Sequence, residues 1–249
     1  MFTTFIEQGL VVNMDRKKQN ILLSFVAIIM IGVSLVAINN ELVTGSISKT
    51  VAQKSLTDAT DVTVIQQNIE TAKATYDYDT VTAIDPLTIL KESYDTSAYP
   101  AVGQVVVPSV GIHLTVYKGL ANEHLLFGAG TSSPNQSMGS GNYGLVSHRS
   151  AQADLLFTPL DNVVIDDVVY ITDLTNIYEY TVDTNIIVEP NQVQYLSDDF
   201  RQNDGAIITL LTCSDADGLR RRIVQGTLTN TYEMDENKKI TNYFIHEPT

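Results

Sequence analysis

The sequence contains a single cysteine, no tryptophan and four histidines in 249 residues. One cysteine excludes an internal disulfide framework, and no spacing of cysteine and histidine resembles a zinc site. The histidines are too scattered for a metal cluster, so we expect no metal and no cofactor. Positive charge is also scarce, with 15 lysines and arginines against 29 acidic residues. The net charge of -14 argues against nucleic acid as a partner, because its phosphates would be repelled.

The chain has one long apolar run, at residues 21–38, and this run carries no charge. A helix rises about 1.5 Å per residue, so the run would extend roughly 27 Å, close to the hydrocarbon thickness of a bilayer. The basic block 16–18 precedes the run and Glu41 follows it. The positive-inside rule therefore predicts a single-pass transmembrane anchor, with residues 1–20 in the cytoplasm and the rest outside the cell. A cleavable signal peptide is the alternative, but the run is long for one and no Ala-x-Ala site follows.

Residues 1–13 fit no part of this topology. Met14 would begin an ordinary short cytoplasmic segment, so we hypothesise that translation starts there. Peptides from Thr3 or Phe5 in N-terminal mass spectrometry would refute this hypothesis.

Composition divides the remainder of the chain. Residues 39–83 are rich in Thr, Ser, Gln, Asp and Ala, which favours a polar extracellular stalk. Asp85 and Pro86 suit the N-cap and first position of a short helix, so the folded domain is expected to span 84–232. Residues 233–249 are interpreted as a polar C-terminal tail.

Within the folded domain, short runs rich in Val, Ile, Thr and Tyr recur between turn signals after Pro100. This spacing favours a mainly β fold, either a closed antiparallel barrel or a sandwich. The runs lie at 104–107, 114–117, 143–147, 168–172, 177–188, 206–212 and 223–232.

The lone cysteine, Cys213, ends one of these apolar runs and is followed by a polar loop. His148 ends a second run and Arg221 precedes a third. A thiolate nucleophile needs a proton partner, and a tetrahedral oxyanion needs a donor or a fixed positive charge. One Cys, one His and one Arg at strand ends can supply all three. The alternative is that Cys213 is a small buried core residue.

With these residues the chain resembles the sortases, cysteine transpeptidases of Gram-positive cell surfaces, and their class A branch in particular. Thr209-Leu210-Leu211-Thr212-Cys213 is similar to the family's cysteine motif, Val146-Ser147-His148 to its histidine strand, and Arg221-x-x-Val224-x-Gly226 to its arginine strand. Further segments resemble the family at 103–108, 111–112, 116–120, 128–131 and 156–160. The resemblance covers roughly residues 99–231 and implies a closed eight-stranded β-barrel with short helices.

The resemblance also implies a reaction. Cys213 attacks the Thr–Gly bond of a Leu-Pro-x-Thr-Gly (LPxTG) sorting signal and forms a thioester. His148 protonates the departing amine and later deprotonates the incoming one, and Arg221 stabilises the oxyanion. An amine of a cell-wall precursor of the lipid II type then resolves the thioester, so the expected partners are LPxTG-containing surface proteins, that precursor and the membrane.

Other residues are assigned less directly. Arg220 and Arg222 flank Arg221, and only the match of Val224 and Gly226 to the family pattern selects the middle arginine. Thr212, Val146 and Ala129 match positions near the family's peptide groove, although strand packing explains all three equally well. The polar connection 189–204 resembles the loop that closes over the sorting peptide in class A enzymes.

Three alternatives stay open at this point. A papain-like cysteine peptidase normally has its Cys before its His in the chain, whereas here His148 precedes Cys213. An L,D-transpeptidase would need a Ser-His-Gly-Cys type cluster, which the sequence lacks. A non-enzymatic, anchored β domain that binds a partner would leave Cys213 inert. The polar tail lacks the membrane segment usual in pilin-polymerising sortases, which favours a housekeeping class A role.

Overall fold

The structure is a computed structural model that describes residues 20–21, 23–30, 40–78, 81, 95–197, 200–201, 204–215, 218–235 and 237–245. The chain forms two compact units, Met1–Asn40 and Glu41–Thr249. In the first unit, residues 20–21 and 23–30 are helical. No helix within the described ranges has the length and apolarity needed to span a bilayer. Met14, the remainder of the 21–38 run and the short helix expected at Asp85 lie outside the described residues.

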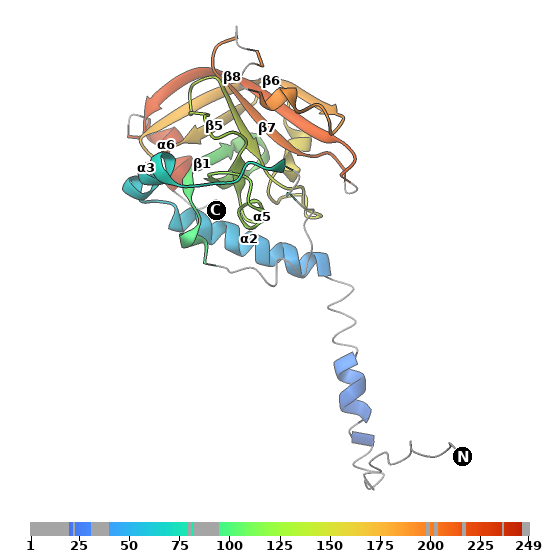
Figure 1. Cartoon of the computed structure of the whole chain (residues 1–249). Helices are drawn as coiled ribbons and strands as arrows, with labels where there is room; N and C mark the ends of the chain where they lie inside the picture. Colours follow the sequence, from blue (N-terminus) through green and yellow to red (C-terminus); the bar gives the residue numbers. More distant parts are fainter. Residues whose placement is uncertain are drawn as a thin grey trace, which may run out of the picture. The chain divides into compact units, whose positions relative to one another are not determined.

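The second unit is built around a closed barrel with the strand order β1-β2-β3-β4-β7-β8-β6-β5 (Figure 1). Closure leaves no exposed sheet edge. This confirms the mainly β barrel and rules out the sandwich. The strands are β1 Ala101–Val107, β2 Ile112–Tyr117, β3 Ala129–Thr131, β4 Asn142–Val146, β5 Val168–Thr172, β6 Asn176–Val188, β7 Ile207–Cys213 and β8 Arg221–Glu233.

Two strand pairs of the barrel are parallel, β2 with β3 and β4 with β7, whereas the sequence favoured an antiparallel barrel. Parallel neighbours require a long crossover connection, and the chain between β4 and β7 carries two further strands. The parallel β4–β7 pair places the C-terminal ends of both strands at the same end of the barrel.

Side chains alternate between the interior and the exterior of the barrel along each strand. Leu145 of β4, Leu210 of β7 and Val224 of β8 are fully buried in the main core. The neighbouring residues Val146 and Leu211 pack in a separate cluster with Leu196 and therefore lie on the outer face.

Short helices surround the barrel. They are α2 Asn40–Asp58, α3 Val62–Thr71, α5 Asn122–Leu125 and α6 Lys238–Ile245, with 3-10 turns η2 Thr96–Ala98, η3 Pro108–Val110, η4 Thr158–Asn162 and η5 Val193–Leu196. Asp61 caps α3, since its carboxylate accepts hydrogen bonds from the backbone N–H groups of Thr63 and Val64.

Helices α2 and α3 pack against the barrel, so residues 40–71 differ from the polar stalk favoured by composition (Figure 1). The buried hydroxyl of Ser55 in α2 hydrogen-bonds to Thr115 Oγ1 at 2.6 Å and to the hydroxyl of Tyr117. Ile65 of α3 is 1% exposed and packs beside Tyr117. Small polar residues look solvated in a sequence, but here they are buried because each hydroxyl finds a partner.

The C-terminal residues also differ from the expected polar tail. Ile240 and Phe244 lie four positions apart on α6, so they share one helix face. They are both 6% exposed and pack against Val106 of β1 and Ile177 of β6. Helix α6 therefore belongs to the folded unit.

Candidate active site

The strand register brings Cys213, His148 and Arg221 to one end of the barrel. In the parallel β4–β7 pair, Val146 lies opposite Leu211, and the Ser147 N–H continues the ladder by donating to the Leu211 carbonyl at 3.2 Å. Extending this register by two residues places His148 beside Cys213. On the other side of β7, Cys213 pairs directly with Arg221 of β8. The segment that carries His148 therefore runs along one side of β7, and Arg221 lies on the other side, next to Cys213.

Cys213 and Arg221 also share a face of the barrel. Cys213 lies two residues after Leu211, which is on the outer face, so alternation along β7 turns Cys213 to the same face. Arg221 has the parity opposite to the core residue Val224, so it lies on the outer face too. The thiol is partly exposed, as a nucleophile that attacks a large substrate must be.

The β7–β8 loop lies close to both Cys213 and Arg221. A Cβ added to Gly218 would lie 3.9 Å from the Cys213 Sγ, and Gly218 has a φ of +66°, which favours glycine. The Arg221 Nη1 donates to the Gly218 carbonyl at 2.7 Å. The guanidinium is thus held by the loop that borders the sulfur.

His148 is 8% exposed, and burial lowers its pKa to about 4. The imidazole is therefore neutral near pH 7 and able to accept a proton from a neighbouring thiol. Its backbone is fixed by the Phe157 N–H, which donates to the His148 carbonyl at 3.2 Å. The other described histidines have packing roles: His124 contacts Tyr99 and Tyr117 with ring centroids 4.9 and 5.2 Å away, and His113 hydrogen-bonds to Gln104.

The connection between β6 and β7 covers the outer face next to these residues. The Tyr195 carbonyl in η5 accepts hydrogen bonds from Asn142 at 2.8 Å and from Thr209 at 3.3 Å. Leu196 follows and packs with Val146 in an apolar cluster. A Cβ on Gly144 would approach Leu196 Cδ2 to 2.9 Å and Ser132 Oγ to 2.0 Å, so this close packing requires glycine.

The structure separates the three expected groove residues. Val146 is 6% exposed and lies on the same face as Cys213. Ala129 is fully buried in the main core and has no accessible surface. Thr212 is 1% exposed and alternates to the inner side with Leu210, and its hydroxyl has no hydrogen-bond partner within the described part of the chain.

The three consecutive arginines have different partners. Arg220 is exposed and forms an ion pair with Asp215 at 3.5 Å, whereas Arg222 pairs with Asp161 at 2.7 Å. Within the described part of the chain, the side chain of Arg221 hydrogen-bonds to two backbone carbonyls, those of Gly218 and Arg220. These contacts favour Arg221 as the arginine available to a substrate. The sequence analysis did not identify Asp161 or its partner Arg149. The position of Arg149 directly after His148 was the available signal for this pair.

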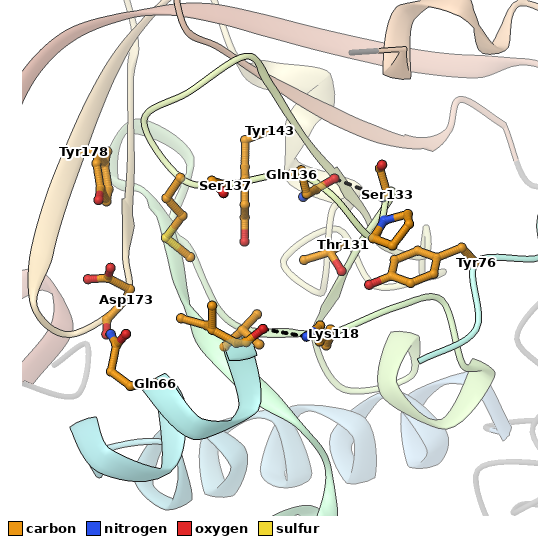
Figure 2. Close-up of a pocket in the computed structure, with 14 residues that line it drawn as sticks. Gln66, Tyr76, Lys118, Thr131, Ser133, Gln136, Ser137, Tyr143, Asp173 and Tyr178 are labelled. Atoms are coloured by element: carbon orange, nitrogen blue, oxygen red, sulfur yellow. Dashed lines mark hydrogen bonds between the residues drawn. The ribbon is translucent and has the colours of Figure 1, made fainter. Parts of the chain in front are cut away.

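A cavity of about 240 Å³ lies at the opposite end of β4 (Figure 2). Tyr143, near the start of β4, faces it together with Gln136, Tyr178 and Lys118. Its polar groups are bonded within the protein, since the Lys118 ammonium donates to the Ile69 carbonyl at 2.6 Å and Gln136 accepts from the Ser133 N–H at 3.0 Å. The cavity lining includes none of the three residues discussed above. Among the described residues, no group of three acidic, histidine or cysteine side chains is placed to hold a metal ion.

Comparison with known proteins decides the family. The model of the sortase domain family matches residues 105–229. The chain belongs to the sortase family. Sortase A of Listeria monocytogenes serovar 1/2a is 30% identical over 216 residues, which cover 87% of this chain and 93% of the relative. Sortase A of Streptococcus agalactiae serotype III is 34% identical over 167 residues, 65% of this chain and 66% of the relative.

Solved structures agree with the sequence matches. The crystal structure of Listeria monocytogenes sortase A is 35% identical, with a TM-score of 0.53, and the match covers 59% of this chain and 99% of that one. These similarities confirm the sortase resemblance and the barrel, and they support a cysteine transpeptidase of the cell wall.

Proposed function

We propose that this sortase cleaves an LPxTG-type sorting signal between Thr and Gly and transfers the new threonine carboxyl end to an amine of a lipid II type precursor. The observation that supports the proposal is the register of β7, in which Cys213 pairs with Arg221 of β8 and Leu211 pairs with Val146, two residues before His148. A thiol, a neutral imidazole and a fixed cation at one strand end are the groups needed for acyl transfer.

In the first half of the reaction, the Cys213 sulfur forms a bond to the threonine carbonyl carbon while its proton passes to the neutral His148. Arg221 stabilises the oxyanion that results. The carbon–nitrogen bond to glycine then breaks, and the imidazolium gives its proton to the departing amine. The product is a thioester between Cys213 and the threonine.

In the second half, the precursor amine attacks the thioester carbonyl and gives a proton to His148. The carbon–sulfur bond breaks, the proton returns to the sulfur, and a new amide links the surface protein to the precursor. The lowered pKa keeps the imidazole neutral at pH 7 and so able to receive each proton, but it also makes the imidazole a weaker base than one whose pKa lies near 7.

The substrate's apolar residues need a surface beside the thiol. Val146 with Leu211 and Leu196 forms such a surface on the outer face, and the 189–204 connection lies against it. The inner-side position of Thr212 leaves its backbone, rather than its hydroxyl, to contact the peptide. Ala129 would act indirectly, by allowing β3 to pack closely against its neighbours.

We also propose that residues 21–38 anchor the protein in the membrane, with a cytoplasmic N-terminus and the unit Glu41–Thr249 outside the cell. The uncharged run and the preceding basic block support this topology. The proposed substrates and the amine acceptor are found on that side of the membrane.

The test is incubation of the full chain, in detergent, with fluorogenic Leu-Pro-x-Thr-Gly peptides with and without amine acceptors. We expect cleavage between Thr and Gly, a product joined to the amine, and no turnover by Cys213→Ala. Alkylation of Cys213 by a methanethiosulfonate separates the alternatives, since an inert thiol and an uncleaved peptide would indicate a non-enzymatic binding domain. Cleavage that ignores added amines would indicate a hydrolytic peptidase.

A further inference from the structure

Two of the proposed catalytic residues are followed in the chain by an arginine, and both arginines bind the same carboxylate. Arg149 follows His148, and its Nη2 lies 2.6 Å from Asp161 Oδ2. Arg222 follows Arg221, and its Nε donates to Asp161 Oδ1 at 2.7 Å. Each carboxylate oxygen therefore holds a different arginine, and Asp161 bridges the histidine segment to the arginine strand.

The bridge lies on the side of the strands opposite to the thiol. Arg222 has the parity of the core residue Val224, so it alternates away from Arg221 and toward the interior. It lies opposite Thr212 in β7, directly beside the Cys213–Arg221 pair. Asp161 belongs to η4, whose residues Thr158 to Leu160 are buried, so the carboxylate is presented from a packed element.

The two arginine side chains are partly buried, and that of Asp161 is more open. Exposed fractions are 15% for Arg222, 23% for Arg149 and 31% for Asp161. Burial opposes ionisation of Asp161, but the hydrogen bonds and charges of Arg149 and Arg222 outweigh it and lower its pKa. The bridge is consequently charged throughout the neutral range, and partly buried ion pairs of this geometry are more rigid than exposed ones.

Other hydrogen bonds fasten the bridge to the barrel. Arg222 Nη1 donates to Asn185 Oδ1 at 2.6 Å, and Asn185 Nδ2 donates to the Val163 carbonyl at 2.7 Å. Asn185 lies in β6, while Val163 caps η4, so η4 is tied to two strands of the barrel.

His148 needs such a fastening more than Cys213 or Arg221 does. β4 ends at Val146, so His148 lies beyond the last regular strand pair, whereas Cys213 and Arg221 are held within the β7–β8 ladder. The histidine segment is held by the Ser147 N–H bonded to the Leu211 carbonyl, the Ser147 hydroxyl bonded to the Gly128 carbonyl, the Phe157 N–H bonded to the His148 carbonyl, and the pair of Arg149 with Asp161. Among these contacts of the described residues, the pair with Asp161 is the one that links the segment to the arginine strand.

We propose that Asp161 is a positioning residue that sets the distance between His148 and Arg221 across the strand that bears Cys213. This role rests on the proposed function of those three residues. A displacement of about 1 Å in a catalytic group can lower a rate by about a hundredfold, so loss of the bridge is expected to reduce turnover without removing any reacting group.

The test compares Asp161→Ala and Asp161→Asn with wild type in peptide transfer by the full chain. We expect kcat to fall by about tenfold to a hundredfold for the alanine variant and less for asparagine, which keeps one acceptor. KM for the peptide is expected to stay within about threefold, and the rate of Cys213 alkylation within about twofold, because the thiol and the outer apolar surface are intact. The matched control is Asp58→Ala, since Asp58 has a similar exposure of 27% and binds Lys54 and Thr96 away from the site.

A double variant adds a readout that a general loss of stability would not give. If Asp161 acts through Arg149, then Arg149→Ala added to Asp161→Ala lowers kcat little further, so the two effects are not additive. Should the alanine variant fail to fold, Asp161→Asn alone and with Arg149→Ala provides the same comparison. Unchanged kcat in folded Asp161 variants, or a loss equal to that of Asp58→Ala, overturns the proposal. Failure of Cys213→Ala to abolish turnover would instead overturn the proposed function itself.

Discussion

The two ends of β4 differ in a way that shows where chemistry can occur in this barrel. At its start, around Tyr143, lies a cavity of about 240 Å³, in which Lys118 donates to the Ile69 carbonyl and Gln136 accepts from the Ser133 N–H. At its end, Val146 pairs with Leu211, two residues before the partly exposed Cys213, and Cys213 pairs with Arg221. This cavity is lined by none of the three proposed catalytic residues. The strand register is therefore a better guide to the proposed site than the cavity.

We expect the largest effect on peptide transfer from a substitution of Cys213. Cys213→Ala removes the nucleophile, so we expect transfer to fall to the background rate, measured with a fluorogenic LPxTG peptide and an amine. His148→Asn, which keeps the size of a polar side chain but cannot shuttle the proton, is expected to lose at least a thousandfold in kcat. Cys213→Ala should retain the melting temperature of wild type within a few degrees. Substantial turnover by this variant would show that the chemistry occurs elsewhere.

The arginine triplet gives the next largest effect. We expect Arg221→Ala to lower kcat by a hundredfold to a thousandfold, as removal of an oxyanion donor does in other acyl-transfer enzymes. Arg222→Ala removes the hydrogen bonds to Asp161 and Asn185 and should cost about tenfold. Arg220→Ala breaks an exposed ion pair with Asp215 and should leave turnover near wild type. If Arg222→Ala were inactive and Arg221→Ala remained active, oxyanion stabilisation would have to be assigned to Arg222 instead of Arg221.

The strand ends predicted from the sequence agree best with the structure where an apolar run stops at a motif residue. Cys213 and Arg221 were predicted at strand ends from apolar runs, and the register pairs them, while His148 lies two residues beyond the last residue of β4. The sequence did not predict the parallel β4–β7 pair, because periodicity within a strand carries no information about its partner. It also did not predict Asp161, whose arginine partners are distant in the chain.

The same reasoning explains why residues 40–71 were misjudged. Ser55 reads as a solvated residue in a polar segment, and its burial depends on Thr115 and Tyr117, about sixty positions later. Composition reports which residues can be solvated, whereas tertiary hydrogen bonds decide which of them are buried. The apolar spacing of Ile240 and Phe244 was a local signal for α6, but it is too short to outweigh the polar residues around it.

A pH titration sharpens the comparison by separating stability from catalysis. Burial lowers the pKa of His148 and of His113 to about 4, below the usual value of 6.5. Between these values the unfolded chain binds more protons than the folded protein, so stability is complete above pH 6.5 and declines as the pH falls toward 4. For His113, which lies on β2 away from Cys213, the loss is roughly 3 kcal/mol.

His113→Gln is therefore expected to flatten the dependence of unfolding free energy on pH between 6.5 and 4, measured by urea denaturation. Turnover at pH 7 should be unchanged, because His113 contacts Gln104 and Phe244 rather than the site. His148→Asn should flatten the same window while abolishing turnover. A steep decline that persists in both variants would mean that other groups control acid stability.

The smallest expected effect belongs to the cavity end. Lys118 lines the cavity, and its ammonium donates to the Asn68 and Ile69 carbonyls at the end of α3. Lys118→Met keeps the length of the side chain and removes the charge and both hydrogen bonds, although the Asn68 carbonyl keeps the Ala72 N–H as a donor. The substitution should cost about 1 kcal/mol of stability. Because β4 separates the cavity from Cys213, kcat for peptide transfer should stay within about twofold of wild type. A tenfold loss of kcat at unchanged stability would show that the two ends of β4 are coupled. The cavity end would then contribute to catalysis, which contradicts the functional difference between the two ends.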